Sequence, residues 1–257
     1  MKYVSITFDD GRKDNYIYAY PILKKYNQTA TLFCTTGFID GTWKPSEWKR
    51  QVSPMAIDEL KKLDDEGWEI ALHGDKHTTE IEDLKHAYEK MLRWGIGHIP
   101  YGFSMPNSRI EREKLETVIK AHLGRTISYI RQGRAVNTQK LSTKIQFGLY
   151  TYLHIQRAYN AFNAPSLNSL NCLDVKNLSS VVVRGNDSAK MIARFVNQMP
   201  DNTWAILMLH SIEPDAKNKG PWCWSDSQFD KLCELLKKME ENNVCRVKTI
   251  KKVLEEI

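Results

Sequence analysis

Short apolar runs alternate with amphipathic stretches along almost the whole chain. The first run has apolar residues at Tyr3, Val4, Ile6 and Phe8 and predicts a buried strand. It stops at two adjacent carboxylates and a glycine, Asp9-Asp10-Gly11. Similar runs predict further strands over 29–35, 68–72, 99–103, 126–130, 181–183, 204–209 and near Val244.

Between these strands, apolar residues recur at helical spacing and predict helices. The first covers 14–26, where Pro21 predicts a kink or a broken start. Start signals for other helices are Ser53-Pro54 (with Gly67 at the end), Thr79 with Glu82, Ser108 with Glu111, Asp187 or Ser188, and Ser225 with Gln228. A C-terminal helix completes the series.

The region from about 133 to 179 is harder to interpret than the rest. An aromatic-rich stretch, 150–162, predicts a helix there, and 164–169 predicts a loop. Elsewhere strands and helices alternate from end to end, which predicts an α/β fold with a parallel sheet and helices outside it. No proline- or glycine-rich linker interrupts the alternation, so we expect one domain over 1–257, with 133–180 as a candidate insertion.

The composition is that of an ordinary globular protein, with 42% hydrophobic and 26% charged residues among 257. The formal net charge is +6, but no basic stripe with interleaved aromatic residues is visible, so no nucleic-acid partner is expected. The longest apolar runs are too short to span a membrane. We therefore expect no stable membrane insertion.

Cysteine usage indicates a reducing compartment. The five cysteines are odd in number, scattered and without a C-x-x-C pair. The chain enters a strand almost at its first residue, which leaves no room for a secretory signal. Both features favour a cytoplasmic location, and neither indicates an oligomeric state.

Polar side chains follow the ends of several predicted strands. They are Asp9, Asp10, His73, Pro106, Arg131, Asp187 and His210. In a barrel of parallel strands the carboxyl ends share one face, where active sites are built. This clustering favours an enzyme.

Asp9 and Asp10 point to a metal site. Adjacent carboxylates repel each other and are costly to desolvate, so a cation is expected beside them, although a simple polar turn would use the same residues. On a helical turn, His73 and His77 would both reach one ion; the alternative is two surface histidines. With Asp10 they form a three-ligand set that leaves a position for water, as in catalytic zinc sites. Zinc would lower the pKa of that water towards about 7.

These motifs resemble those of the polysaccharide deacetylases with the NodB-homology domain, carbohydrate esterase family 4. Residues 7–11 read T-F-D-D-G, residues 73–77 read H-x-x-x-H, and 207–210 match the family's late histidine strand. The blocks 1–131 and 181–257 carry the resemblance. It implies a distorted (β/α) barrel.

The resemblance also implies roles for single residues. Asp10, His73 and His77 would bind the metal, Zn²⁺ or another divalent transition metal. Asp9 would be the general base that deprotonates water, and His210 the general acid that protonates the leaving amine. A carboxylate and an imidazole are suited to these proton transfers near neutral pH.

The third motif departs from the family pattern. The family commonly has F-R-x-P-x-G, with an arginine that holds the catalytic aspartate, whereas residues 103–108 read F-S-M-P-N-S. Arg131, at the end of the next strand, either replaces that arginine as a catalytic residue or lies on the surface. The backbone N–H of Asn107 would fall at the oxyanion position and does not depend on the side chain. In the second motif, Gly74 replaces a serine or threonine whose hydroxyl would brace the loop.

Three residues are expected to contact the substrate: Trp43, Pro106 and Trp222. The two tryptophans lie in predicted loops, where their faces would stack on sugar rings. Trp48 and Trp224 lie in such loops as well. For Trp224, directly before Ser225, a hydrophobic staple on the following helix is the alternative.

The resemblance thus implies a metal-dependent hydrolase that removes an N-acetyl group from a sugar of a glycan or glycan precursor. With a cytoplasmic location, a lipid- or nucleotide-linked precursor is the expected substrate. One alternative is hydrolysis of another small C–N amide at the same site. The other is a catalytically silent carbohydrate-binding relative, against which Asp9 and His210 argue, because binding alone needs neither an acid nor a base.

Overall fold

The computed structural model describes residues 1–46, 52–108, 112–122, 124–136, 138–214, 216 and 219–257. Its central strand is β1 (Lys2–Phe8), which pairs in parallel with β8 (Thr203–Leu209) along its full length and with β2 (Thr31–Cys34) on its other side. Every residue of β1 after Lys2 is buried. Such burial is expected where helices cover one face of a parallel sheet and a packed interior covers the other.

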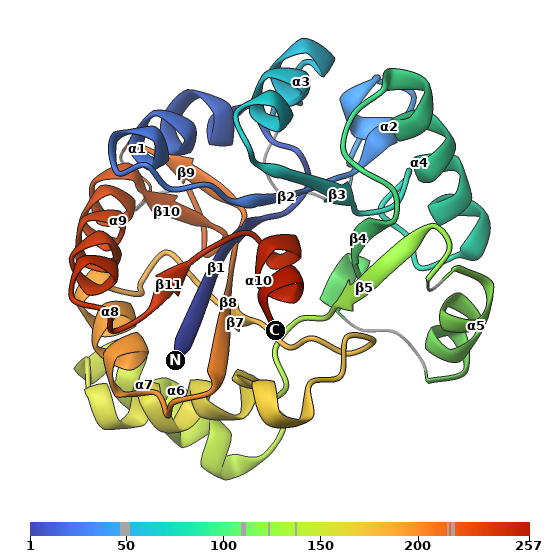
Figure 1. Ribbon diagram of the computed structural model, residues 1–257. Coiled ribbons are helices and arrows are strands. Elements are labelled where there is room, and N and C mark those ends of the chain that lie inside the picture. Colours follow the sequence, from blue (N-terminus) through green and yellow to red (C-terminus); the bar gives the residue numbers. More distant parts are fainter. Residues whose placement is uncertain (47–51, 109–111, 123, 137, 215, 217–218) are drawn as a thin grey trace.

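The sheet extends on both sides of β1 and curls into a ring (Figure 1). From β2, parallel pairs lead to β3 (Glu69–Leu72), β4 (Tyr101–Ser104) and β5 (Ile127–Arg131). From β8, a parallel pair leads to β7 (Val181–Val182). The segment before β7 closes the ring, because Val175 and Leu178 form backbone hydrogen bonds of 2.7–3.0 Å with Ile130 and Gln132. The predicted distorted (β/α) barrel is confirmed.

Helices surround this ring on the outside, as Figure 1 shows. They are α1 (Tyr20–Lys25), α2 (Thr36–Ile39), α3 (Ile57–Asp65), α4 (Ile81–Trp94), α5 (Arg112–His122), α6 (Leu141–Leu153), α7 (Gln156–Asn163), α8 (Ala189–Gln198) and α9 (Asp226–Glu241). In contrast, α10 (Ile250–Glu256) lies in the middle of the view.

Two buried apolar clusters correspond to the inside and the outside of the barrel. The larger cluster lies between the sheet and the outer helices. The smaller one contains Phe33, Tyr129 and Trp204 from the strands together with Ile250 and Val253 of α10. Because alternate residues of a strand face the same side, the side chains of β1 that join Tyr3 on the inside are Ser5 and Thr7. The next position in this series is Asp9, at the mouth of the barrel.

The expected strands and helices are present, but several helices begin elsewhere than predicted. The broken start predicted for 14–26 is confirmed, because a π-helical turn (Asn15–Ala19) precedes α1 and Pro21 lies in the first turn of α1. The Ser53-Pro54 start of α3 is wrong. The helix follows Ala56, whose N–H donates to the Glu59 carboxylate at 2.9 Å.

The capping predictions for α4 and α9 also need correction. α4 follows Glu80 rather than Thr79. α9 does follow Ser225, but Gln228 accepts a hydrogen bond from the Ala189 N–H at 3.0 Å instead of capping its own helix. The predicted cap of α8 is confirmed, since Ser188 Oγ accepts the N–H of Met191. Trp48 and Glu111 lie outside the described residues.

The helix predicted over 150–162 is wrong in its extent. α6 ends at Leu153, His154 adopts a left-handed φ of 53°, and α7 begins at Gln156. The two short 3₁₀ turns that follow, Ala164–Ser166 and Leu170–Cys172, flank β6 (Asn168–Ser169), which runs antiparallel to β8. The loop predicted over 164–169 is therefore wrong. Three strands were not predicted, namely β6, β9 (Ser211–Glu213) and β10 (Cys223–Ser225), and the last two pair in parallel.

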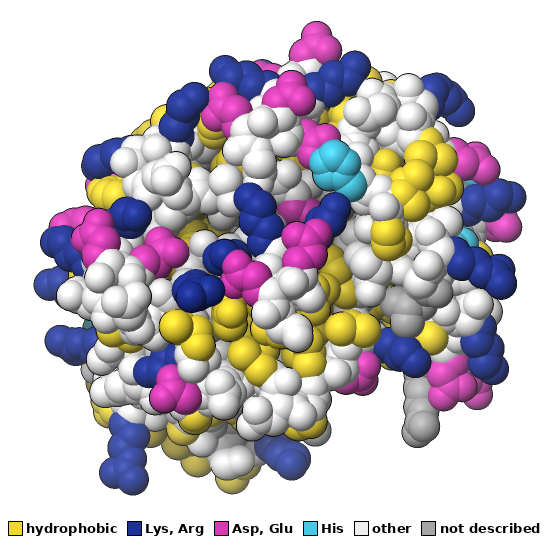
Figure 2. Space-filling model, viewed as in Figure 1, with side chains coloured by type: hydrophobic (Ala, Val, Ile, Leu, Met, Phe, Trp, Pro, Cys, Tyr) yellow, Lys and Arg dark blue, Asp and Glu magenta, His cyan; other side chains and the backbone are white. Residues whose placement is uncertain are grey.

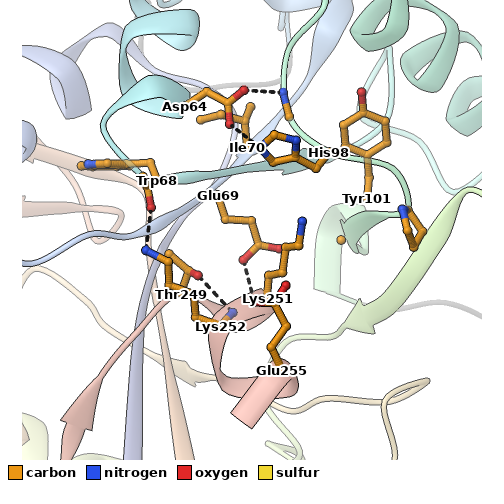
Figure 3. A pocket seen from close by; sticks show the side chains of 14 residues that line it. Asp64, Trp68, Glu69, Ile70, His98, Tyr101, Thr249, Lys251, Lys252 and Glu255 are labelled. Carbon is orange, nitrogen blue, oxygen red and sulfur yellow. Dashed lines mark hydrogen bonds and ion pairs between the residues drawn. The ribbon is translucent and has the colours of Figure 1, made fainter.

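The amino-terminal end of the barrel is plugged by α10. The Glu69 carboxylate accepts hydrogen bonds from Tyr129 Oη at 2.6 Å, Thr31 Oγ1 at 2.8 Å and the Lys251 N–H at 2.9 Å, and desolvation raises the pKa of this carboxyl. β11 (Arg246–Val247), which pairs with β1, leads into the plug. A pocket beside it is lined by residues that include Asp64, His98 and Lys252 (Figure 3).

Charged side chains of both signs surround this end of the molecule (Figure 2). The predicted catalytic and metal-binding side chains lie at the other end of the barrel, where the parallel strands finish. Within the described residues, no helix is both long and apolar enough to cross a membrane.

Candidate metal centre and active site

The end of β1 turns sharply and directs two neighbouring aspartates to different places. Asp10 and Gly11 both have a φ of 81°, a left-handed conformation that is uncommon for residues other than glycine. Such conformations persist where the surrounding structure fixes them, often at functional sites. Both carboxylates are buried.

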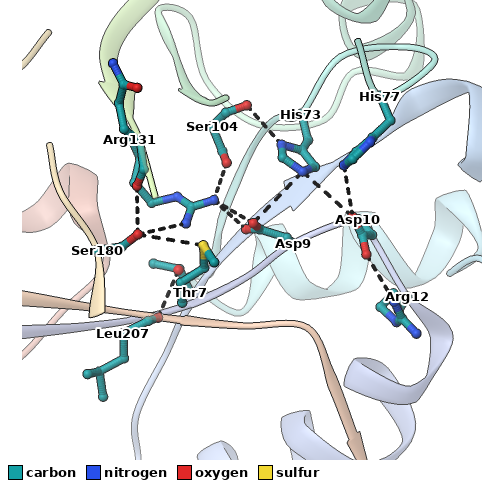
Figure 4. A network of polar contacts seen from close by, with 12 residues as sticks. Thr7, Asp9, Asp10, Arg12, His73, His77, Ser104, Arg131, Ser180 and Leu207 are labelled. Carbon is teal, nitrogen blue, oxygen red and sulfur yellow. Dashed lines mark hydrogen bonds and ion pairs between the residues drawn. The ribbon is translucent and has the colours of Figure 1, made fainter. Parts of the chain in front are cut away.

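Asp10, His73 and His77 meet at one point, and their candidate ligand atoms all lie within 4.8 Å of one another (Figure 4). Asp10 Oδ1 is 3.7 Å from His73 Nε2 and 3.8 Å from His77 Nε2. Two ligand atoms held about 2.1 Å from one tetrahedral ion are separated by roughly 3.4 Å. The ligand atoms of the three residues therefore need to move only slightly closer to one another to share an ion.

The protonation states also suit a metal ion. Burial lowers the pKa of His73 to about 4, so its imidazole is neutral near pH 7. His73 Nδ1 lies 2.9 Å from the Ser104 carbonyl oxygen and must donate to it, which leaves Nε2 with its lone pair towards Asp10. Burial alone would raise the pKa of Asp10, but His210 and Arg12 nearby hold it below its usual value. One carboxylate and two imidazoles fit zinc or a similar transition metal.

The loop that carries the two histidines is not the helical turn that their spacing suggested. Residues 73–77 form an irregular bend in which Gly74 and His77 have φ values of 80° and 56°. The Asp83 carboxylate holds this loop by accepting the N–H groups of Asp75, Lys76 and Thr78 at 2.7–3.2 Å. A Cβ at position 74 would overlap Asp83 Oδ2. The glycine therefore admits a carboxylate brace where the family usually has a hydroxyl.

Arg12 was not singled out in the sequence, yet it contacts the metal-binding aspartate. Its Nη1 donates to Asp10 Oδ2 at 3.1 Å, while Asp10 Oδ1 faces the two histidines. The orientation of the Asp10 carboxylate is thereby fixed. The only sequence signal is the position of Arg12, directly after the T-F-D-D-G motif.

Arg131 reaches Asp9 across the barrel mouth (Figure 4). Its Nη2 donates to both oxygens of Asp9, at 2.8 and 2.6 Å, and also to Ser104 Oγ. Its guanidinium lies 4.8 Å from the centroid of the Phe33 ring, and Nη1 donates to Ser180 Oγ at 3.4 Å. Arg131 is only 1% exposed, so it is not a surface residue.

His210 follows β8 and lies close to both aspartates. Its backbone oxygen accepts a 2.7 Å hydrogen bond from Asn15 Nδ2, a residue that the sequence did not indicate. Burial lowers the pKa of His210, opposed by the charges of Asp10 and Asp9. Within the described residues its Nδ1 is buried and has no hydrogen-bond partner.

Tryptophan rings lie beside two histidines of the site, His77 and His210. The Trp43 ring stacks on His77, with centroids 6.3 Å apart and planes 14° apart, and the Trp222 ring lies 4.7 Å from the ring of His210. Trp222 is 44% exposed, so part of its surface is free to meet a ligand. Trp224 is buried, and its Nε1 donates to the backbone carbonyl oxygen of Asp187 at 2.8 Å. Its ring is therefore not available to stack on a sugar.

The third motif lies directly after β4. Pro106 is buried, whereas the side chain of Asn107 is exposed and its backbone has a φ of 57°. Contact of Pro106 with a substrate and the oxyanion role of the Asn107 N–H remain predictions.

Comparison with known proteins gives one family. The family model for polysaccharide deacetylase matches residues 1–151. The Bacillus subtilis protein YxkH, whose name suggests a polysaccharide deacetylase, is 30% identical over 130 residues, 46% of this chain. The match spans 42% of YxkH, less than half of its length.

Solved structures share the fold at low sequence identity. The peptidoglycan N-acetylglucosamine deacetylase Bc1960 superposes with a TM-score of 0.53 and 14% identity, over 96% of this chain and 86% of that one. The family 4 acetyl xylan esterase of Clostridium thermocellum, solved with a cobalt ion, gives 0.53 and 12% over 99% and 91%. The family model covers more than half of the sequence, and the chain belongs to the polysaccharide deacetylase family.

Proposed function

We propose that this protein is a metal-dependent hydrolase that removes an N-acetyl group from a sugar of a glycan or glycan precursor. The observation that carries this proposal is the arrangement of two separate polar groups at one barrel mouth. Asp10, His73 and His77 form a ligand set, and Asp9 lies beside it, with its carboxylate hydrogen-bonded to Arg131 and 3.9 Å from His73 Nε2. A site for binding alone would not need the second carboxylate.

A divalent ion held by Asp10, His73 and His77 would supply Lewis acidity to a water molecule and to the acyl oxygen. Asp9 accepts the proton of the attacking water, and Arg131 keeps the Asp9 carboxylate in one orientation. His210 gives a proton to the amine as the C–N bond breaks. The lowered pKa of His210 makes its protonated form a stronger acid than an exposed histidine. The Asn107 N–H is the candidate donor to the developing oxyanion.

We further propose zinc or another divalent transition metal as the ion, and a cytoplasmic location. Two imidazoles with one carboxylate support a transition metal over magnesium or calcium, which prefer oxygen ligands. Within the described residues none of the five cysteines forms a disulfide and four of them are buried, which supports a reducing compartment. A lipid- or nucleotide-linked N-acetylated sugar remains the proposed substrate class.

Substitution of the two neighbouring aspartates tests these roles. Asp10→Asn weakens a metal bond, so metal content and acetate release should both fall. Asp9→Asn keeps the shape but accepts no proton, so metal should stay while turnover drops by about a hundredfold or more. Both are measured by metal analysis and by acetate release from a panel of N-acetylated sugars.

Other outcomes would contradict the proposal in different ways. Equal metal loss in both variants would mean that the roles are wrongly assigned. Hydrolysis of a small amide without acetate release from any sugar would favour the alternative amidase. Sugar binding with no hydrolysis in the metal-loaded wild type would identify a silent relative.

A further inference from the structure

Helix α6 presents an apolar face to solvent. Its inner side packs on the molecule through Phe147 and Tyr150. On the opposite side, Leu141, Ile145 and Tyr152 are 73%, 53% and 76% exposed. These positions are spaced by four and seven residues, so they lie in one stripe along the helix. A helix on the surface of a globular protein normally has polar residues there.

The apolar surface continues past the end of α6. Leu153 and Ile155, at the turn into α7, are 65% and 39% exposed. Among the described residues, eleven large hydrophobic side chains are exposed, and five of them fall within 141–155. Figure 2 shows hydrophobic side chains in the lower part of the view, where α6 and α7 lie in Figure 1. Scattered exposed hydrophobic residues need no explanation, but a contiguous patch indicates a binding surface.

The charged side chains of the segment that carries this patch all have one sign. The sequence from Thr117 to Leu173 contains no aspartate or glutamate. Lys140, Lys144 and Arg157 are exposed on the α6–α7 pair, and none of them pairs with a carboxylate among the described residues. A second copy of this chain would bring like charges together, whereas an anionic surface would neutralise them.

We propose that α6 and its turn into α7 dock on an anionic lipid bilayer. The apolar stripe enters the headgroup region, and Lys140, Lys144 and Arg157 lie against the lipid phosphates. This combination of an apolar stripe with flanking basic residues is typical of helices that lie in a membrane interface without crossing it.

The inner side of α6 is connected to the catalytic end of the barrel through packed side chains. The Arg184 guanidinium lies 5.5 Å from the Phe147 ring of α6 and 5.3 Å from the Trp222 ring, which itself contacts His210. A bilayer on the outer side of α6 would therefore lie beside the barrel mouth. This geometry suits a substrate carried on a membrane, but the docking itself does not rest on the proposed deacetylation.

Vesicle sedimentation tests the proposal with the full chain. The protein should sediment with vesicles of phosphatidylcholine and phosphatidylglycerol at roughly two to one, and not with phosphatidylcholine alone. The double variant Leu141→Ser, Ile145→Ser keeps every charge and should lower the partition coefficient by at least about tenfold. Lys140→Gln and Lys144→Gln should each lower it by about fivefold.

Leu92→Ser is the matched control, because Leu92 is 42% exposed on α4, away from the patch, and should leave sedimentation unchanged. Circular dichroism checks that each variant is folded. Absence of wild-type sedimentation at low salt would overturn the proposal. Sedimentation of the double variant at the wild-type level would also overturn the proposal, because binding would then depend on net charge and not on the apolar stripe. A dimer that this variant dissociates, without vesicle binding, would assign the face to a second copy.

Discussion

At the scale of single residues, the geometry shows how a missing motif residue is compensated. The family arginine would extend from position 104, where this chain has Ser104. Arg131 comes from the neighbouring strand and passes beside the serine hydroxyl to reach Asp9. Because parallel strand ends converge on the mouth, the same guanidinium position is accessible from either strand.

Arg131→Ala should remove the partner of Asp9 and reduce turnover. We expect kcat for acetate release to fall by at least about tenfold at unchanged metal content, because the base loses its fixed orientation. Unfolding free energy should drop by about 3–5 kcal/mol, since a buried carboxylate is left unpaired. Kinetics and urea unfolding measure the two effects.

Two further variants make the Arg131 prediction specific. Arg125→Ala removes an exposed arginine that precedes β5 and should be silent. The double variant Arg131→Ala, Ser104→Arg places the guanidinium at the usual family position and should recover part of kcat. Wild-type turnover in Arg131→Ala would contradict the positioning role.

Gly74→Ala should weaken metal binding although position 74 provides no ligand. The added methyl group overlaps Asp83 Oδ2, so the loop that carries His73 and His77 must shift. Loss of such a supporting contact typically lowers metal affinity by about 10- to 100-fold, which competition with a chelating dye measures. Gly124→Ala is the control, because Gly124 has a similar φ of 79° and nothing within 4 Å of its Cβ position. Equal effects of both would attribute the loss to backbone strain alone.

At the scale of elements, strands were predictable because their apolar runs are local in sequence. The first residues of helices were less predictable, because polar side chains near them form hydrogen bonds with other segments of the chain. Gln228 bonds to the start of α8 instead of its own helix. Asp83 holds the histidine loop, although it lies within α4. Such partners depend on tertiary packing that a local pattern does not contain.

The caps of α8 and α9 give a matched comparison of element stability. Ser188 Oγ accepts the Met191 N–H at 3.2 Å, whereas Ser225 makes no side-chain cap to α9. Ser188→Ala should therefore lower the unfolding free energy by about 1 kcal/mol, and Ser225→Ala by clearly less. Chemical denaturation decides the matter, and an equal cost would show that the Ser188 bond adds nothing.

At the scale of the whole molecule, the parallel barrel gathers strand ends that are far apart in sequence. The convergence of parallel strand ends was enough to predict from the sequence that five residues lie near one another: Asp9, Asp10, His73, Arg131 and His210. It could not supply Arg12 or Asn15, whose side chains follow β1 and bond to residues of the site. Nor could it supply the α6–α7 break or the ring closure by 175–180, which have no periodic signal.

A buried carboxyl should make the stability of the molecule depend on pH. Burial raises the pKa of Asp187 from 3.8 to about 6. Between these values the folded state binds more protons than the unfolded state, so stability falls as pH rises through this window. The difference in unfolding free energy between wild type and Asp187→Asn should decrease by roughly 3 kcal/mol from about pH 3 to about pH 7, with about two thirds of the change between pH 4 and pH 6. Urea unfolding at several pH values measures it, and parallel curves for the two proteins would contradict the assignment.

Both termini lie at the plugged end of the barrel (Figure 1). β1 starts there at Lys2, and α10 finishes there at Glu256, while the catalytic groups occupy the far ends of the strands. An affinity tag, a fused reporter or a tether to a solid support can be attached at either end without crowding the mouth. Immobilisation through one terminus would hold the protein with its active site directed away from the support, an orientation suited to assays with large glycans.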